Sequence, residues 1–261
     1  MTNILNKICE KKRIELIESK KRCSFASLEK ILQDKKNRGF KNLLVKAHKQ
    51  KKNNVIAEIK QASPSAGIIV QDYYPESIAV NYEKAGAGAI SILTETFFFN
   101  GTLDHLSLIN QKSNLPIIRK DFIIDPYQIL ESKVYKADAI LLIAAILSDN
   151  QIKEFIDIAY NFGLDCLIET HTEKELERAI NIGYPIIGIN NRNLKDLSVN
   201  INNSMDLVKK IPSKFTVIAE SGIKVREDII RYNELGVFNF LIGESILKSS
   251  NISKKIKEFI F

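Results

Sequence analysis

Charged and amide side chains close several short apolar runs of this sequence. Glu58 and Lys60 lie near the end of one run, and Lys120, Glu169 and Asn190 end three others. A lysine and a carboxylate held close together can act as general acid and general base, because one donates a proton and the other accepts it. An amide can orient a reacting group through hydrogen bonds. These residue types indicate proton-transfer chemistry at a shared site.

Two later apolar runs are followed by small residues that suit an anion. One run leads into Ser221, Gly222 and Ile223, and the next leads into Gly243, Glu244 and Ser245. Glycine lets the backbone approach a ligand closely, and free amides at the start of a helix can hold a phosphate group. Because a carboxylate repels phosphate, we expect the side chain of Glu244 to point away. The two segments predict a phosphate site.

The histidines and cysteines offer no pattern for a metal site. The three histidines lack metal-ligand spacing, and the three cysteines form no CxxC pair, so we expect free thiols and no metal. His171 follows Glu169 by two positions. We favour a structural role for it over a catalytic pair with that carboxylate.

Eight short apolar runs rich in β-branched residues recur beyond residue 50, and a helical pattern follows each of them. The runs cover residues 55–60, 89–94, 116–120, 139–143, 165–169, 186–190, 216–220 and 238–242. Strands that alternate with helices indicate βα units on a parallel sheet, and eight such units close a barrel. We therefore predict an α/β fold, a (β/α)8 TIM barrel. A doubly wound open sheet is the alternative, but no GxGxxG motif opens any βα unit.

The predicted barrel would bring the reactive residues together, because active sites of this fold lie at the C-terminal ends of the strands. Glu58 and Lys60 differ by two positions and so face the same side of their strand. If that side is the barrel interior, the pair is held in the mouth. Residues 97–101, Phe-Phe-Phe-Asn-Gly, are expected to form an apolar loop over the mouth or to pack against it.

The first fifty residues carry helical patterns and many charges but no strand pattern. The helical patterns cover residues 3–22, 27–34 and 43–49. We predict a single domain over residues 1–261, with a helical N-terminal extension (1–50) and the barrel (51–261). We favour a structural cap over a regulatory element as the role of the extension.

Composition and charge favour an enzyme of small molecules. The 261 residues carry a net charge of +7, but the lysines are spread along the chain and no RNA-binding aromatic motif accompanies them. No apolar stretch reaches eighteen residues, and the N-terminus lacks a leader pattern. We expect a cytoplasmic protein, a monomer or weak homodimer, that binds neither nucleic acid nor membranes.

Several segments in combination resemble those of indole-3-glycerol phosphate synthase, a barrel enzyme of tryptophan biosynthesis. The segments are residues 56–60 with 63–65 and 67, 119–123 with 125, 127 and 128, 168–169 with 171, 188–194, 220–223 and 241–245. They follow the family's order from about residue 55 onward. A fragment such as Glu-Ser-Gly is unspecific by itself, whereas the combination is specific. The helical extension also resembles that of the family.

The resemblance implies a reaction as well as a fold. The substrate would be 1-(2-carboxyphenylamino)-1-deoxyribulose 5-phosphate, and the products indole-3-glycerol phosphate, carbon dioxide and water. The ring carbon that bears the carboxylate must attack the ketone, so an acid has to protonate the ketone oxygen. Loss of the carboxylate then restores aromaticity, and a second acid–base event expels water. No step needs a metal or redox cofactor, and none is expected.

By the same resemblance, Lys120 aligns with the family's general acid and Glu169 with its general base. Lys60 aligns with a lysine that binds the anionic part of the substrate and assists dehydration. Glu58 and Asn190 align with polar residues that orient the anilino nitrogen or assist proton transfer. The division of acid and base duties among these residues stays open.

Further positions align with substrate contacts. The substrate-binding set is Ser63, Phe122, Arg192, Glu220 and Ser221, and the phosphate-binding set is Gly222, Gly243, Glu244 and Ser245. Phe122 aligns with an apolar wall that presses the aromatic ring toward the ketone. We also hypothesise that Lys60 and Arg192 lower the pKa of Lys120, because neighbouring cations disfavour a charged lysine.

Two other functions fit a barrel with a phosphate site. Phosphoribosylanthranilate isomerase would be expected to use a cysteine and an aspartate at strand ends, whereas Glu58 and Lys60 end the first strand here. A non-catalytic binding barrel would be expected to lose its strand-end charges, which are all present.

Overall fold

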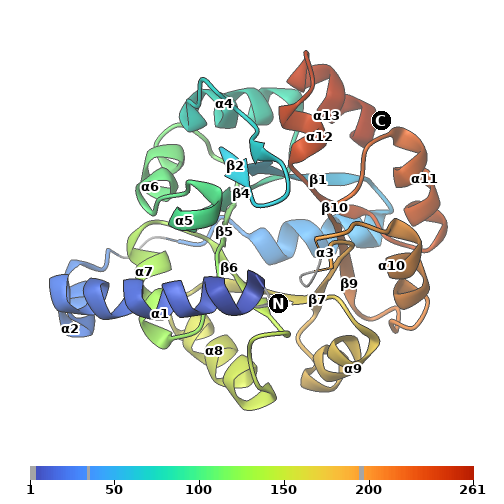
Figure 1. The fold of residues 1–261 in the computed structure, drawn as a ribbon. Helices are drawn as coiled ribbons and strands as arrows, with labels where there is room; N and C mark the ends of the chain where they lie inside the picture. Colours follow the sequence, from blue (N-terminus) through green and yellow to red (C-terminus); the bar gives the residue numbers. More distant parts are fainter. Residues whose placement is uncertain (1–3, 34–35, 194–196) are drawn as a thin grey trace.

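Eight parallel strands form the centre of the molecule, and helices surround them (Figure 1). The computed structural model describes residues 4–33, 36–193 and 197–261. The barrel strands are β1 (Asn54–Ile59), β4 (Ala89–Leu93), β5 (Ile117–Lys120), β6 (Ala139–Ile143), β7 (Asp165–Thr170), β8 (Ile186–Asn190), β9 (Thr216–Glu220) and β10 (Asn239–Ile242). The predicted TIM barrel is confirmed, and each strand end lies within one residue of its predicted position.

The barrel closes because β1 pairs with both β4 and β10. Ile56 lies opposite Ala89 on one side and Leu241 on the other. Ile56 belongs to the cluster that fills the barrel interior, whereas Val55 packs in the cluster beneath the outer helices. Side chains alternate along a strand, so Glu58 shares the interior face with Ile56. The alternation explains why a glutamate in an otherwise apolar strand reaches the mouth.

Helices follow the barrel strands, and most of them cover the outside of the barrel. They are α4 (Pro75–Ala85), α5 (Thr96–Phe99), α6 (Asp104–Asn110), α7 (Pro126–Val134), α8 (Asp149–Asn161), α9 (Glu173–Ile182), α10 (Ile201–Val208), α11 (Arg226–Glu234), α12 (Glu244–Leu247) and α13 (Ile252–Ile260). Ser148 and Thr172 cap α8 and α9, each accepting a hydrogen bond from a backbone amide of the first turn. No helix within the described residues is long and apolar enough to cross a bilayer.

The N-terminal extension divides between the two ends of the barrel. In α3 (Phe40–Gln50), the Leu44 carbonyl accepts a hydrogen bond from Asn239 at the start of β10, so α3 closes the N-terminal end. In α1 (Ile4–Arg22), Lys12 pairs with Asp121 just beyond β5, so α1 borders the mouth (Figure 1). The extension therefore reaches the end at which the active site of a barrel lies.

The boundaries of the extension differ from the prediction. α2 (Phe25–Ile31) begins two residues earlier than predicted, because Ser24 caps it. α3 is longer at both ends, starting directly after Gly39, whose φ of +84° is left-handed. Asn3 and Asp34, at two predicted helix ends, and Leu194, in one motif, lie outside the described residues.

Candidate active site

A cavity of about 920 Å³ opens at the C-terminal ends of the strands. Thirteen of the fourteen residues singled out from the sequence line it: Glu58, Lys60, Lys120, Phe122, Glu169, Asn190, Arg192, Glu220, Ser221, Gly222, Gly243, Glu244 and Ser245. They come from six strands and the loops that follow them. The volume suits a ligand of the size of a substituted sugar phosphate.

Ser63 is the exception and does not line the cavity. It lies in a small hairpin in which β2 (Ala62–Ser63) pairs with β3 (Gly67–Ile68). Its hydroxyl accepts a hydrogen bond from the Ala66 amide at 3.2 Å, which stabilises the turn. Ser65 in that turn lines the cavity instead and accepts a hydrogen bond from Arg192 Nη1 at 3.0 Å. Ser65 is a candidate that sequence reasoning missed, although it belongs to the same motif.

Lys120 lies between two buried carboxylates at the base of the cavity. Its ammonium donates a hydrogen bond to Glu169 Oε2 and lies 3.1 Å from Glu220 Oε2. These residues lie at the C-terminal ends of three different strands, β5, β7 and β9. Glu58 and Lys60 form a second ion pair in the same mouth, as their spacing predicted. The cluster combines three carboxylates with two lysines within one cavity.

The hypothesis that neighbouring cations lower the pKa of Lys120 is wrong. Burial does favour the neutral amine, but the carboxylates of Glu169, Glu220 and Glu58 outweigh it and raise the pKa above its ordinary value. Lys60, one of the cations invoked, is paired with Glu58. The sequence could not reveal the error, because the distances among strand ends depend on how the barrel closes.

The two carboxylates beside Lys120 differ in their proton affinity. Burial raises the pKa of both, but Lys120 and His171 together hold the pKa of Glu169 well below its ordinary value. Burial and the negative charge of Glu169 raise the pKa of Glu220 to about 8, against the influence of Lys120. At neutral pH the site therefore contains an ionised Glu169 and a Glu220 that holds a proton for most of the time.

An apolar wall forms the side of the cavity nearest α1 and β6. Phe122 and Phe99 belong to it, as expected, together with residues that sequence reasoning missed, namely Leu93, Leu141 and Ile143. Leu141 and Ile143 differ by two positions on β6, so the same alternation that placed Glu58 and Lys60 could have identified them. Phe99 of the 97–101 segment faces the cavity, whereas Phe97 is exposed beneath Lys11 at 5.4 Å.

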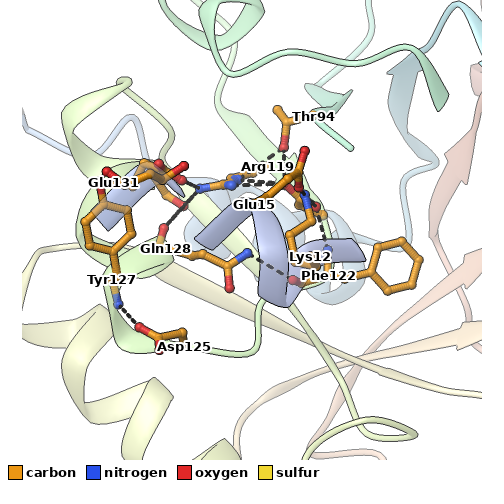
Figure 2. A network of polar contacts seen from close by, with 12 residues as sticks. Lys12, Glu15, Thr94, Arg119, Phe122, Asp125, Tyr127, Gln128 and Glu131 are labelled. Atoms are coloured by element: carbon orange, nitrogen blue, oxygen red, sulfur yellow. Dashed lines mark hydrogen bonds and ion pairs between the residues drawn. The ribbon is translucent and has the colours of Figure 1, made fainter. Parts of the chain in front are cut away.

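The backbone of Phe122 is held on both sides by a buried polar network (Figure 2). Its amide donates to Asp121 Oδ1 at 2.8 Å, and its carbonyl accepts from Gln128 Nε2 at 3.0 Å. Asp121 Oδ2 in turn accepts from Thr94 at 2.7 Å and from Arg119 Nη2 at 2.9 Å. The wall residue is therefore positioned by strand β5, helix α7 and the end of β4.

Lys12 joins this network from the N-terminal extension. Its ammonium lies 3.0 Å from Asp121 Oδ1 and 2.6 Å from Glu15, and its side chain is 6% exposed (Figure 2). Burial disfavours the charged form of Lys12, but Asp121 and Glu15 outweigh it and raise its pKa. Through this ion pair the N-terminal extension contacts Asp121, the residue directly after Lys120.

Replacing Lys12 with methionine is expected to reduce the free energy of unfolding. The change leaves Asp121 with Arg119 as its remaining cation, so the expected loss is about 2–4 kcal/mol, somewhat below the cost of leaving a buried charge without any partner. Urea denaturation followed by circular dichroism measures it. Lys7→Met is the matched control, because Lys7 is exposed on the same helix. Equal midpoints for the two variants would show that the buried pair contributes nothing.

Cations and glycines border the side of the cavity opposite the apolar wall. Gly222 has a φ of +76°, and a Cβ atom there would lie 2.5 Å from Val199 Cγ1, so the position requires glycine. Arg192 lines this side together with Lys224, Lys248, Lys254 and Lys255. The four lysines were missed by sequence reasoning, since Lys248, Lys254 and Lys255 follow the last strand at a distance.

Glu244 stays on the cavity rim, contrary to the expectation that it points away. Its Oε1 accepts a hydrogen bond from Lys248 at 2.6 Å, and its Oε2 lies 3.9 Å from Arg192. Lys248 lowers the pKa of this carboxylate, against partial burial. Its charge is offset by neighbouring cations, which reduces its repulsion of an anion.

The protein is a closed (β/α)8 barrel, and an acid–base cluster and a cationic rim lie at the C-terminal ends of its strands. These features place it in the class of barrel enzymes that act on small phosphorylated molecules. The family model described as indole-3-glycerol phosphate synthase matches residues 5–259. The chain belongs to this family, which confirms the resemblance found in the sequence.

Individual relatives agree with the family match. An indole-3-glycerol phosphate synthase of Acetivibrio thermocellus is 46% identical over 259 residues and covers 98% of both chains. That of Campylobacter jejuni subsp. doylei is 44% identical and covers 98% of this chain and all of its own length. A solved 3-hexulose-6-phosphate synthase has a TM-score of 0.63 over 79% of this chain and 97% of its own, at 10% identity, and is similar in fold alone.

Proposed function

We propose that this cavity performs the family reaction, the conversion of 1-(2-carboxyphenylamino)-1-deoxyribulose 5-phosphate into indole-3-glycerol phosphate. A carbon–carbon bond forms between the carboxylate-bearing ring carbon and the ketone carbon. The ring then loses carbon dioxide, and the former ketone oxygen leaves as water. The observation that carries the proposal is Lys120, held between Glu169 and Glu220 beside the apolar wall.

In the proposal, Lys120 binds and protonates the ketone oxygen. The raised pKa of Lys120 keeps its side chain charged, so it stabilises negative charge on the oxygen as the new bond forms. An alkoxide is more basic than an amine, so the proton passes to the oxygen once ring closure is complete.

Glu169 and Glu220 have different duties in the proposal. Ionised Glu169 stabilises the cation that decarboxylation and dehydration pass through, and accepts the proton that the anilino intermediate releases. Glu220, whose pKa is about 8, holds a proton near neutral pH and donates it to the hydroxyl that leaves as water, and while protonated it neutralises less of the charge on Lys120 than an ionised carboxylate would. Glu58 and Asn190 orient the anilino nitrogen from the other side of the mouth.

The apolar wall and the cationic rim orient the two ends of the substrate. Phe122, Phe99 and Leu141 offer a surface for the aromatic ring, which supports its approach to the ketone. Arg192, Lys60 and the segments around Gly222 and Gly243 surround the phosphate and sugar end. Ser221, Glu244 and Ser245 are further residues around the phosphate and sugar end of the substrate.

A fluorescence assay of indole-3-glycerol phosphate formation tests the function. The purified protein is expected to turn over the carboxyphenylamino-deoxyribulose phosphate and to leave phosphoribosylanthranilate unchanged. Isomerisation of phosphoribosylanthranilate, without indole formation, would replace the proposal by the isomerase alternative. Substrate binding without any turnover would favour a non-catalytic barrel.

Arg192→Gln is expected to raise KM by roughly 10- to 100-fold while kcat changes less than about threefold. A charged hydrogen bond to phosphate contributes about 1.5–3 kcal/mol, and it acts equally before and during the reaction. Steady-state kinetics separate the two constants. Lys209→Gln, which alters an exposed lysine of the surface, is the control. A fall in kcat at constant KM would place Arg192 in the chemical step instead.

The proposal also includes a monomer or weak homodimer that acts in the cytoplasm and binds neither nucleic acid nor membranes. The absence of a nucleic-acid partner rests on the spread of the lysines along the sequence. Light scattering at several protein concentrations tests the oligomeric state, and retention on DNA that falls steeply with salt would contradict the absence of a nucleic-acid partner.

A further inference from the structure

His171 lies behind the catalytic cluster and touches it through one carboxylate. Its Nε2 lies 3.3 Å from Glu169 Oε1, on the opposite carboxylate oxygen from the one that Lys120 contacts. Its Nδ1 lies 3.3 Å from Glu175 Oε2. The side chain is 7% exposed and does not line the cavity. His171 can therefore act on the reaction through Glu169 but not on the substrate directly.

Helix α9 fixes the position of the imidazole. The backbone amide of His171 donates to Glu175 Oε2 at 2.8 Å, and Glu175 stands in the first turn of α9, whose cap is Thr172. One carboxylate thus holds both the main chain and the ring of His171. Rotation of the ring away from Glu169 would break the contact with Glu175, so the orientation is constrained from both sides.

Glu169 and Glu220 both lie beside Lys120, but their contacts differ. Lys120 donates a hydrogen bond to Glu169 Oε2, whereas Glu220 Oε2 lies 3.1 Å from the same ammonium. Glu169 has contacts at both oxygens, Lys120 at one and His171 at the other. A second cation favours the ionised form of Glu169 only. The difference between the two carboxylates thus follows from Lys120 and, in addition, from a residue outside the cavity.

We propose that His171, as an imidazolium anchored by Glu175, is a positioning residue that orients Glu169 and, together with Lys120, keeps Glu169 the ionised member of the carboxylate pair. The inference rests on the proposed function, in which Glu169 acts as base. It replaces the purely structural role that the sequence favoured for His171.

The charge of His171 persists through neutral pH. Burial lowers the pKa of the imidazole, but Glu169 and Glu175 outweigh it and raise the pKa to about 9. In the described part of the chain these two carboxylates, from β7 and α9, are the charged groups that act on the ring; Lys120 and Glu220 lie one contact further away. A group with a raised pKa is charged below that pKa and loses its charge as the pH rises through it. The contribution of His171 should therefore be complete below pH 8 and fade near pH 9.

Two substitutions separate the charge of His171 from its volume. His171→Gln is expected to lower kcat about tenfold, the low end of what loss of an orienting partner costs, with KM changed less than about threefold. His171→Lys keeps a positive charge and is expected to recover part of that loss. His105→Asn is the control, because His105 is a half-buried histidine on α6, away from the cavity. Thermal unfolding of each variant shows whether it is folded.

The ratio of kcat for His171→Lys to kcat for the unaltered protein is the decisive measurement. Titrations common to both proteins, such as that of Glu220, cancel in this ratio. It is expected to be constant from pH 6 to 8 and to rise above pH 9, where the imidazole loses its charge and the lysine does not. A ratio that stays flat to pH 10, or a kcat of folded His171→Gln equal to that of the unaltered protein, would overturn the proposal.

A double-mutant cycle shows whether His171 acts through Glu169. Adding His171→Gln to Glu169→Gln is expected to cause no further loss of kcat, since the carboxylate that His171 orients is already gone. Additive losses would contradict the proposal. Full activity of Glu169→Gln alone would instead contradict the proposed function, so the two failures are distinguishable.

Discussion

Lys120→Met should lower kcat by roughly 10²- to 10⁴-fold, the range that a general acid commonly contributes. The variant has no group that can protonate the ketone oxygen from the position between Glu169 and Glu220. It also leaves two buried carboxylates without their shared cation, so Glu169 should take up a proton more readily. Steady-state kinetics with the fluorescence assay measure the loss. Loss of charge and loss of the proton donor thus act in the same direction.

Two further variants show which property of Lys120 causes the loss of kcat. Lys120→Arg keeps the positive charge but does not release a proton in the relevant pH range, so it should recover substrate binding and little of kcat. Lys112→Met, at an exposed lysine ahead of β5, controls for a general effect of losing a lysine. If Lys120→Arg restored nearly full kcat, charge alone would explain the role of Lys120, and the proton transfer would be wrong.

Glu169→Gln should lower kcat by roughly 10²- to 10³-fold, with a smaller effect on KM. Glutamine preserves the shape of the side chain but neither accepts a proton nor offers a negative charge. The negative charge of Glu169 is one cause of the raised pKa of Glu220, so the substitution should also lower the pKa of Glu220 from about 8. The proton that Glu220 holds at neutral pH would then be lost in part.

The pH profile of the Glu169→Gln variant checks that second effect. The pKa assigned to Glu220 in the kcat profile should move to lower pH, because an ionised Glu220 now neutralises Lys120 by itself. Glu169→Asp, which keeps the charge on a shorter side chain, should retain the upper pKa and lose less activity. An unchanged profile in Glu169→Gln would show that the two carboxylates are not coupled in the way their positions imply.

Much of the fold was predictable because its signals are local. Each strand is a short apolar run, and residues that end such runs lie together once the strands are parallel. The two-residue spacing of Glu58 and Lys60 was enough to place them on one face. Family segments then supplied roles for Lys120, Glu169 and Arg192, which local patterns alone do not define.

Other features of the site depend on pairs that are far apart in the sequence. Lys12 and Asp121 are brought together only when α1 packs at the barrel mouth. The orientation of Ser63, in the turn and outside the cavity, follows from the pairing of β2 with β3. No periodic pattern records such contacts, and the role of Ser65 was missed for the same reason.

The sequence by itself determined the barrel, the strand ends and the set of charged residues around the mouth, because these depend on side-chain alternation and apolar runs within short segments. Only the tertiary structure decided how those charges pair. Lys120 lies among carboxylates rather than cations, and His171 contacts Glu169 but not Glu220. Electrostatic interactions depend on distance and burial, which closure of the barrel sets. The same residues in a differently closed sheet would have different proton affinities.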